Sequence, residues 1–101
     1  MLVRYNEGMT TVTDGDFEWD SEKAESNLAK HGVTFGQAIV ALTDKHAIET
    51  ADLLDSSRVV TFGFEPVSGV LLVVTTEVAD RTRIISARPA TPAQSRRYHE
   101  G

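Results

Sequence analysis

Three residues near the start of the chain have the types and spacing of a polar line on a helix. Lys23, Asn27 and Lys30 follow one another at intervals of four and three positions, which places them within about 60° of arc on an α-helix. Lysines neutralise phosphates, and neighbouring cations can lower the pKa of a lysine until it accepts a proton. For a single lysine a solvated helix face is the more frequent explanation, so the line needs support from elsewhere in the chain.

A second set of cations lies near the C-terminus. The chain carries a net charge of −5, yet residues 81–101 hold half of its ten Lys and Arg residues and one acidic residue. Guanidinium groups bind phosphates by charge and by paired hydrogen bonds. This segment predicts a localised anion-binding surface, with a solvated charged tail as the alternative. Its arginines are Arg81, Arg83, Arg88, Arg96 and Arg97.

Strand alternation decides which of these arginines share a face. In residues 82–88 it places Arg83, Ile85 and Ala87 on one face and Arg88 on the other. One of the two arginines therefore lies on the open face of the sheet, and the alternation does not say which. Arg58 begins a neighbouring predicted strand.

Two aromatic residues and one histidine could complete a nucleic-acid site. Tyr98, beside Arg96 and Arg97 in the last predicted helix, and Trp19 could stack on bases. A place at the boundary of the core is the commoner role of a tryptophan. His31 is a candidate acid, or a cap for the carbonyl groups at the end of its helix.

Several kinds of chemistry find no support in the composition. The sequence has no cysteine, no glycine-rich phosphate loop, and three histidines without metal-ligand spacing. We expect metal-free chemistry without a cofactor. Because apolar runs are too short for a membrane span and a signal peptide is not evident, we expect a cytoplasmic protein.

Local signals delimit the elements that must position these residues. Asp20 and Gly32 bound a predicted helix over 21–31, and Thr34 with Gln37 forms a capping box that opens a second helix. That second helix carries an apolar stripe and ends near residue 43. The stripe consists of Phe35, Ala38, Ile39 and Leu42.

The remaining chain is predicted to form strands and one short helix. We expect strands over 17–19, 46–50, 58–65, 70–78 and 82–88, and a C-terminal helix opened by Thr91 and Pro92. This order predicts an α+β fold: a twisted antiparallel sheet of about four strands, two N-terminal helices on one face and a short C-terminal helix. Residues 1–15 are expected to form a partly disordered leader, and 16–101 a single domain.

Two separated sequence blocks resemble the BrnT toxin family. The first is Phe17-Glu18-Trp19-Asp20 followed by Lys23, Asn27, Lys30-His31-Gly32-Val33 and Phe35, and the second is Arg83-Ile84-Ile85-Ser86-Ala87-Arg88. Arg58 and the tail Arg96-Arg97-Tyr98-His99-Glu100 are similar to further family features. The resemblance implies a RelE-like fold, a ribonuclease that stops translation, and neutralisation by a ribbon-helix-helix antitoxin. It also implies a hetero-oligomer with at least two toxin copies that contacts operator DNA only through the antitoxin.

Metal-free RNA cleavage needs a base, an acid and cations. We assign Lys23 as the base, Arg58 and Arg83 as transition-state stabilisers, with Arg88 as the substitute for Arg83, and His31 or Tyr98 as the acid. Asn27 and Lys30 would position the RNA backbone. The acidic net charge, and Ala29 where many relatives have a basic residue, favour the alternative of an inactive binding protein that acts with its antitoxin as a co-repressor.

Overall fold

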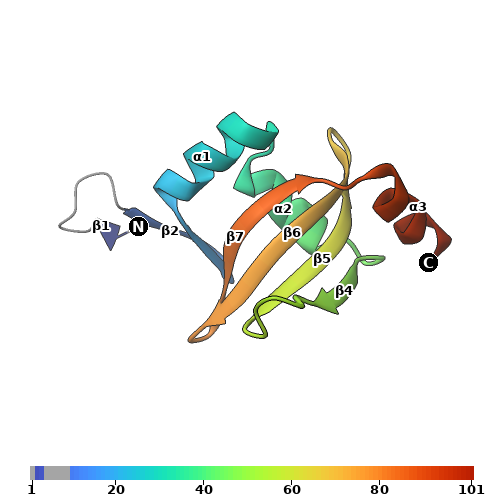
Figure 1. The fold of residues 1–101 in the computed structure, drawn as a ribbon. Coiled ribbons are helices and arrows are strands. Elements are labelled where there is room, and N and C mark those ends of the chain that lie inside the picture. The colour runs from blue at the N-terminus through green and yellow to red at the C-terminus, as the bar shows by residue number, and fades with distance from the viewer. Residues whose placement is uncertain (1, 4–9) are drawn as a thin grey trace.

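The computed structural model describes residues 2–3 and 10–101 (Figure 1). One mixed sheet of seven strands, in the order β1-β2-β3-β7-β6-β5-β4, carries helices α1 and α2 on one face. The opposite side is called the open face below; the third helix, α3, lies at one end of the sheet (Figure 1). The strands are β1 (Leu2–Val3), β2 (Thr10–Asp14), β3 (Phe17–Asp20), β4 (Ile48–Ala51), β5 (Arg58–Glu65), β6 (Gly69–Val78) and β7 (Arg81–Pro89), and the helices are α1 (Ser21–His31), α2 (Phe35–Leu42) and α3 (Pro92–Glu100).

The three helices begin where their capping residues predict. The Asp20 carboxylate accepts the backbone N–H of Glu22 at the start of α1, and Gly32 ends that helix with a φ of 69°, a conformation that favours glycine. Thr34 and Thr91 open α2 and α3 with complete capping boxes. The predicted bounds of α1 and α2 are thereby confirmed.

The sheet is larger than predicted and is not purely antiparallel. We expected about four antiparallel strands, whereas the structure has seven and pairs β3 with β7 in parallel. The parallel pair joins Phe17 to Thr82 and Glu18 to Arg83. Residues 10–14, assigned to the leader, form β2 and pair with β3 along its length. Of the rest of the predicted leader, β1 and Gly15 are described, and residues 1 and 4–9 lie outside the described residues.

The core lies between α2 and the middle of the sheet. Phe35, Ala38 and Ala41 of α2 pack with Leu71 and Val73 of β6. Ile39 and Leu42, which the apolar stripe included, are only partly buried, while Ala41 is fully buried. Helix α2 approaches β5 closely at Gly63, where a Cβ atom would lie 2.0 Å from the carbonyl oxygen of Ala41, so that only glycine permits this approach.

A β-bulge in β7 changes which residues share a face. Val74 pairs with Ser86 and the next residue, Thr75, pairs with Ile84, so Ile85 is the extra residue. Ile84 and Ala87 consequently both face the core. The predicted grouping of Arg83 with Ala87 is therefore wrong.

Candidate nucleic-acid site

A row of polar side chains crosses four strands on the open face. Arg58 of β5 lies opposite Thr76 of β6, Thr76 lies opposite Arg83 of β7, and Arg83 lies opposite Glu18 of β3. Directly opposed residues project from the same side of a sheet. The core-facing neighbours Thr61, Ile84 and Trp19 identify that side as the face away from α2. We call these four residues the arginine row.

The two arginines of this row are close enough to reach one anion. β5 and β7 are separated by β6 alone, which puts their backbones about 10 Å apart. The Arg58 and Arg83 side chains are 40% and 28% exposed, so solvent and ligands reach both. Two guanidinium groups on one face of the sheet, with a single strand between them, can bind one phosphate from both sides.

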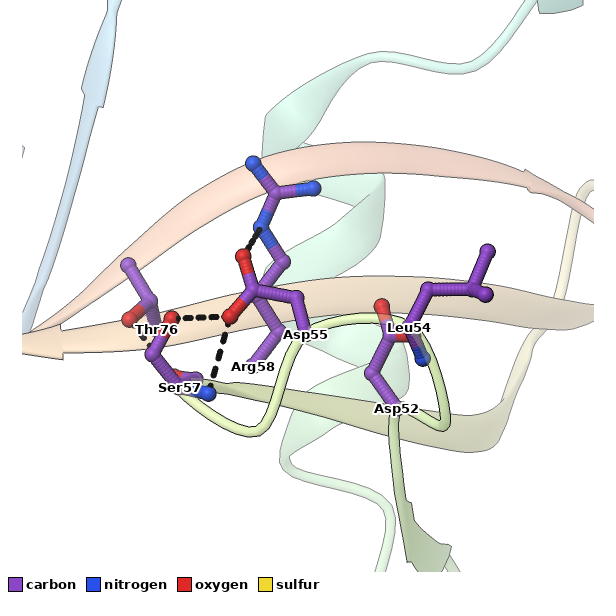
Figure 2. A network of polar contacts seen from close by, with 6 residues as sticks. All are labelled: Asp52, Leu54, Asp55, Ser57, Arg58 and Thr76. Carbon is purple, nitrogen blue, oxygen red and sulfur yellow. Dashed lines mark hydrogen bonds and ion pairs between the residues drawn. The ribbon is translucent and has the colours of Figure 1, made fainter.

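The loop before β5 positions Arg58 (Figure 2). Asp55 Oδ2 lies 3.4 Å from Arg58 Nε, and Figure 2 shows the two terminal nitrogens of the guanidinium directed away from this carboxylate. The Ser57 hydroxyl and backbone amide, together with the charge of Arg58, hold the pKa of Asp55 below its ordinary value. The Thr76 hydroxyl in turn donates to the Ser57 carbonyl at 2.8 Å.

Glu18 holds Arg83 at the other end of the row. Arg83 Nη1 lies 2.5 Å from Glu18 Oε2, and the glutamate side chain is only 11% exposed. A mostly buried carboxylate paired with one arginine fixes the direction of the guanidinium. Sequence reasoning missed Glu18 as a functional candidate, although its place between Phe17 and Trp19 put it on the face opposite the aromatic side chains.

The predicted polar line of α1 lies at the edge of β7, apart from Arg58. Lys23, Lys30 and His31 line a hollow of about 220 Å³ together with Ile85 and Ser86. All three side chains belong to exposed residues. The structure therefore brings Arg58 and Arg83 to one face, but it places Lys23 in a separate edge hollow.

Asn27, predicted to contact RNA, is bound instead to the protein's own backbone. Its Nδ2 donates to the carbonyl oxygens of Val33 and Ala87 at 3.0 and 2.8 Å, and its Oδ1 accepts the N–H of Ala87 at 3.0 Å. The side chain is buried. Asn27 thus pins α1 to the outer edge of β7, which would otherwise be an unpaired sheet edge.

The two predicted stacking residues also have structural partners. Trp19 packs edge-on against Phe35, with ring centroids 6.0 Å apart, beside the core. Tyr98 donates its hydroxyl hydrogen to the carboxylate of Asp44. This hydrogen bond first, and then burial, raises the pKa of Tyr98 to about 12, which disfavours the acid role considered for it. Trp19 faces the helix side of the sheet, away from the arginine row.

The remaining predicted arginines lie near the end of β7 and on α3. Arg88 lies on the open face opposite Leu72, and its Nη1 donates to the Pro89 carbonyl at 3.1 Å. Because Ile85 is an extra residue in β7, Arg88 projects from the same face of the sheet as Arg83. Arg96 and Arg97 are exposed on α3, and only Arg97 lines a hollow described below.

Neither a cluster of metal ligands nor a membrane-spanning helix is found among the described residues. Within residues 2–3 and 10–101, no group of three or more His, Asp or Glu side chains is placed to hold a metal ion. None of the helices in the same ranges is long and apolar enough to cross a membrane.

Fold and surface together define a small α+β protein with arginines on an open sheet face. The family model described as ribonuclease toxin, BrnT, of type II toxin-antitoxin system matches residues 19–94. The chain belongs to this family, and as a type II toxin it has an antitoxin as its partner. This confirms the resemblance found in the sequence.

A solved structure supports the same relationship. The chain is similar to the Brucella abortus ribonuclease toxin BrnT, known from a crystal structure at 1.1 Å, with 26% sequence identity and a TM-score of 0.58. The likeness covers 72% of this chain and 92% of the Brucella chain. Comparison with curated protein sequences gives no match.

Proposed function

We propose that this chain is a metal-independent endoribonuclease that cleaves cytoplasmic RNA at the arginine row and thereby inhibits translation. The observation that carries the proposal is the alignment of Arg58, Thr76 and Arg83 on one solvent-exposed face. Two guanidinium groups can stabilise the negative charge that develops on a phosphate under attack. The RelE-like relationship implied by the sequence supports the same chemistry, in which arginines and lysines carry much of the catalysis.

The reaction follows from RNA's own nucleophile. A base takes the proton of the 2′-hydroxyl, whose oxygen forms a bond to the adjacent phosphorus while the bond to the 5′-oxygen breaks. An acid gives a proton to that leaving oxygen, and the products are a 2′,3′-cyclic phosphate and a 5′-hydroxyl. Arg58 and Arg83 stabilise the pentacovalent transition state, where preorganised donors contribute most.

Glu18 is the base that the geometry favours. Its carboxylate belongs to the arginine row and is held 2.5 Å from Arg83, whereas Lys23 lies in the edge hollow. A carboxylate next to the phosphate-binding arginine is placed to accept the proton as the 2′-oxygen attacks. The base role of Lys23 stays a prediction, which the variants below test against Glu18.

The residues of the edge hollow make further contacts with the RNA substrate. In this proposal Lys30 and Lys23 hold the phosphate next to the scissile one. The acid role of His31 stays a prediction, because His31 lies in the same edge hollow as Lys23. Asn27 serves only to hold α1 in place. Arg88 is a second phosphate contact on the open face.

The antitoxin is proposed to be a ribbon-helix-helix dimer. Such a partner would bring at least two toxin copies into one complex and would carry all contacts to operator DNA. It would neutralise the toxin by covering the open face, since a cationic row is the surface that an acidic partner segment would seek.

Induced expression without the antitoxin tests the function directly. Growth arrest with loss of RNA supports a ribonuclease, and cleavage of purified RNA in excess EDTA supports its metal independence. Normal growth and intact RNA would favour the alternative, an inactive binding protein that acts with its antitoxin as a DNA-bound co-repressor. The acidic net charge of −5 is the feature that keeps this alternative in view.

A further inference from the structure

A groove lies between α3 and the strands β4 and β5, away from the arginine row. Two adjoining hollows form it, of about 690 and 400 Å³, and both are lined by Ile48 and Tyr98. These sizes are within the range of about 300–1,000 Å³ typical of small-molecule sites. We call it the α3 groove; its chemistry comes from Lys45, His46, Phe64, Arg97, Tyr98 and His99.

The lining combines cations with accessible aromatic surface. Phe64 is 42% exposed, an unusual degree for a phenylalanine, and it lines the larger hollow beside Lys45 and two histidines. Arg97 lines the smaller hollow together with Phe62. The described residues that line the two hollows include no Asp or Glu, the Asp44 carboxylate lies behind Tyr98, and Gly101 lines both hollows. Bases stack on aromatic rings while cations take their phosphates, which is how single-stranded nucleic acid is bound.

One wall of the groove is held rigid by the carboxylate of Asp44. It accepts the hydroxyl hydrogen of Tyr98 and the backbone N–H groups of His46 and Phe64. These bonds connect α3, the loop before β4 and β5, so the walls are fixed relative to one another. The Tyr98 ring also supports His99 edge-on, with centroids 5.0 Å apart. A preformed groove loses little conformational entropy when a ligand enters.

The groove and the arginine row lie on the same face of the sheet. Phe62 follows Arg58 by four residues on β5, a distance of about 14 Å along the strand. Arg88 is level with the groove, because it shares a cross-strand row with Leu72, Phe62 and Ile48, and it lies on β7, two strands away from Phe62. A single strand of RNA can therefore run along β7 from Arg83 to Arg88 and then across β6 into the groove.

We propose that the α3 groove binds an unpaired base and the adjoining phosphate of single-stranded RNA, a few nucleotides from the scissile bond. The inference rests on the proposed function for the identity of the substrate, and it adds a subsite and a preference for unpaired RNA of sufficient length. In a chain with a net charge of −5, RNA is repelled from most of the surface. The line of cations from the row to the groove is the path along which it can bind.

Binding of RNA that cannot be cleaved tests the groove separately from catalysis. Fluorescence anisotropy compares 2′-O-methyl RNA of two nucleotides with a labelled oligomer of about eight nucleotides, a length within the usual site sizes. The native chain should bind the longer oligomer more tightly. Phe64→Ala should weaken binding of the longer oligomer about tenfold, as expected for loss of one stacked base. Arg97→Ala should lower the salt slope by about one contact.

The neighbouring arginine provides a matched control. Arg96 is the same residue type, adjacent on α3 and exposed, but it does not line either hollow. Arg96→Ala should leave the affinity for the longer oligomer nearly unchanged, whereas equal losses for Arg96→Ala and Arg97→Ala would mean a diffuse charge effect and overturn the subsite. Should Phe64→Ala fail to fold, the comparison of the two arginines still decides.

The remaining outcomes separate the groove from the proposed function. If the chain cleaves RNA but Phe64→Ala and Arg97→Ala bind the longer oligomer like the native chain, the subsite is wrong and the ribonuclease stands. If RNA is not cleaved yet both variants lose binding, the subsite stands and the ribonuclease is wrong. Loss of antitoxin binding in these variants, with RNA affinity unchanged, would assign the groove to the partner protein and overturn the proposal.

Discussion

Glu18 and Arg83 face each other across the short parallel pairing of β3 and β7, with Glu18 Oε2 2.5 Å from Arg83 Nη1. The carboxylate is the more enclosed of the two groups. The role of Glu18 is therefore either that of a base or that of a group that only holds Arg83 in place.

Glu18→Gln should separate these roles. Glutamine keeps an oxygen that can accept from Arg83 but cannot take a proton, so kcat on an RNA oligomer should fall by about 10²-fold or more while KM changes little. Unchanged kcat in Glu18→Gln, together with a large loss in Lys23→Ala, would return the base role to Lys23.

Arg58→Ala and Arg83→Ala test whether the two arginines act on one phosphate. Each change should lower kcat/KM by about 10²-fold, because one preorganised contact to the transition state is lost. The double variant should lose less than the product of the single effects, as residues that act as a unit do. Arg81→Ala, on the same strand, is the control for general charge, and thermal unfolding should show that the variants remain folded. Additive effects would mean that the arginines serve different phosphates.

Asn27→Ala should reduce stability and leave the chemistry of the arginine row intact in the folded fraction. The change leaves the buried N–H and C=O groups of Ala87 without their partner, at a cost of roughly 2–4 kcal/mol. Urea unfolding measures this loss. Lys30→Ala, one turn further along α1, should stay within about 0.5 kcal/mol of the native chain. Equal stability of the two variants would contradict the structural role of Asn27.

The bond between Tyr98 and Asp44 predicts how the docking of α3 depends on pH. Partial burial acts to raise the pKa of Asp44, but the hydrogen bonds from Tyr98, His46 and Phe64 outweigh it and hold that pKa below the ordinary value of 3.8. The contribution of Asp44 is thus present above pH 3.8 and lost as the pH falls through its lower folded pKa. That of Tyr98 is present below pH 10 and lost as the pH rises through about 12.

The variant Tyr98→Phe tests the contribution of the hydrogen bond between Tyr98 and Asp44. The urea midpoint of the native chain should exceed that of the variant across the neutral range, and the difference should shrink at both extremes of pH. A difference that does not change with pH would show that the hydroxyl contributes packing alone. The control is His99→Ala, which leaves the bond to Asp44 in place.

Light scattering on the co-expressed toxin and antitoxin tests the proposed assembly. A ribbon-helix-helix partner should give a mass corresponding to at least two toxin chains, because such antitoxins are obligate dimers. Neutralisation through the open face further predicts that Arg58→Ala weakens the complex and makes its affinity less dependent on salt, because one ion contact is lost. A strictly one-to-one heterodimer at micromolar concentration would contradict the assembly.

The helices could be predicted from the sequence more closely than the sheet. Asp20, Gly32, Thr34 and Thr91 act on neighbouring backbone groups, so their local sequence is sufficient. Strand β2 has weak periodicity and owes its place to pairing with β3. The parallel pairing of β3 with β7 joins residues about 65 positions apart, and local patterns hold no information about such partners.

The candidate site, too, could be predicted from the sequence only in part. The cationic residue types of the arginine row, Arg58 and Arg83, could be chosen from their positions in predicted strands, and the structure puts them on one face. Their neighbour Glu18 and the separation of Lys23 depend on sheet order, which the sequence did not determine. Asn27 has the residue type of a ligand contact, and only the backbone groups around it reveal that its hydrogen bonds are already made.

The β-bulge at Ile85 makes the arrangement of charges on the open face depend on the number of residues in β7. Arg83 and Arg88 are an odd number of residues apart and would face opposite sides of a regular strand, yet the extra residue brings them to the same side. Deleting Ile85 alone would keep every cation in the chain and still turn one of the two arginines toward the hydrophobic interior. The spacing between the two arginines is therefore under as much physical constraint as their identity, and a relative that differs by one residue in this interval would present a different charge pattern to RNA.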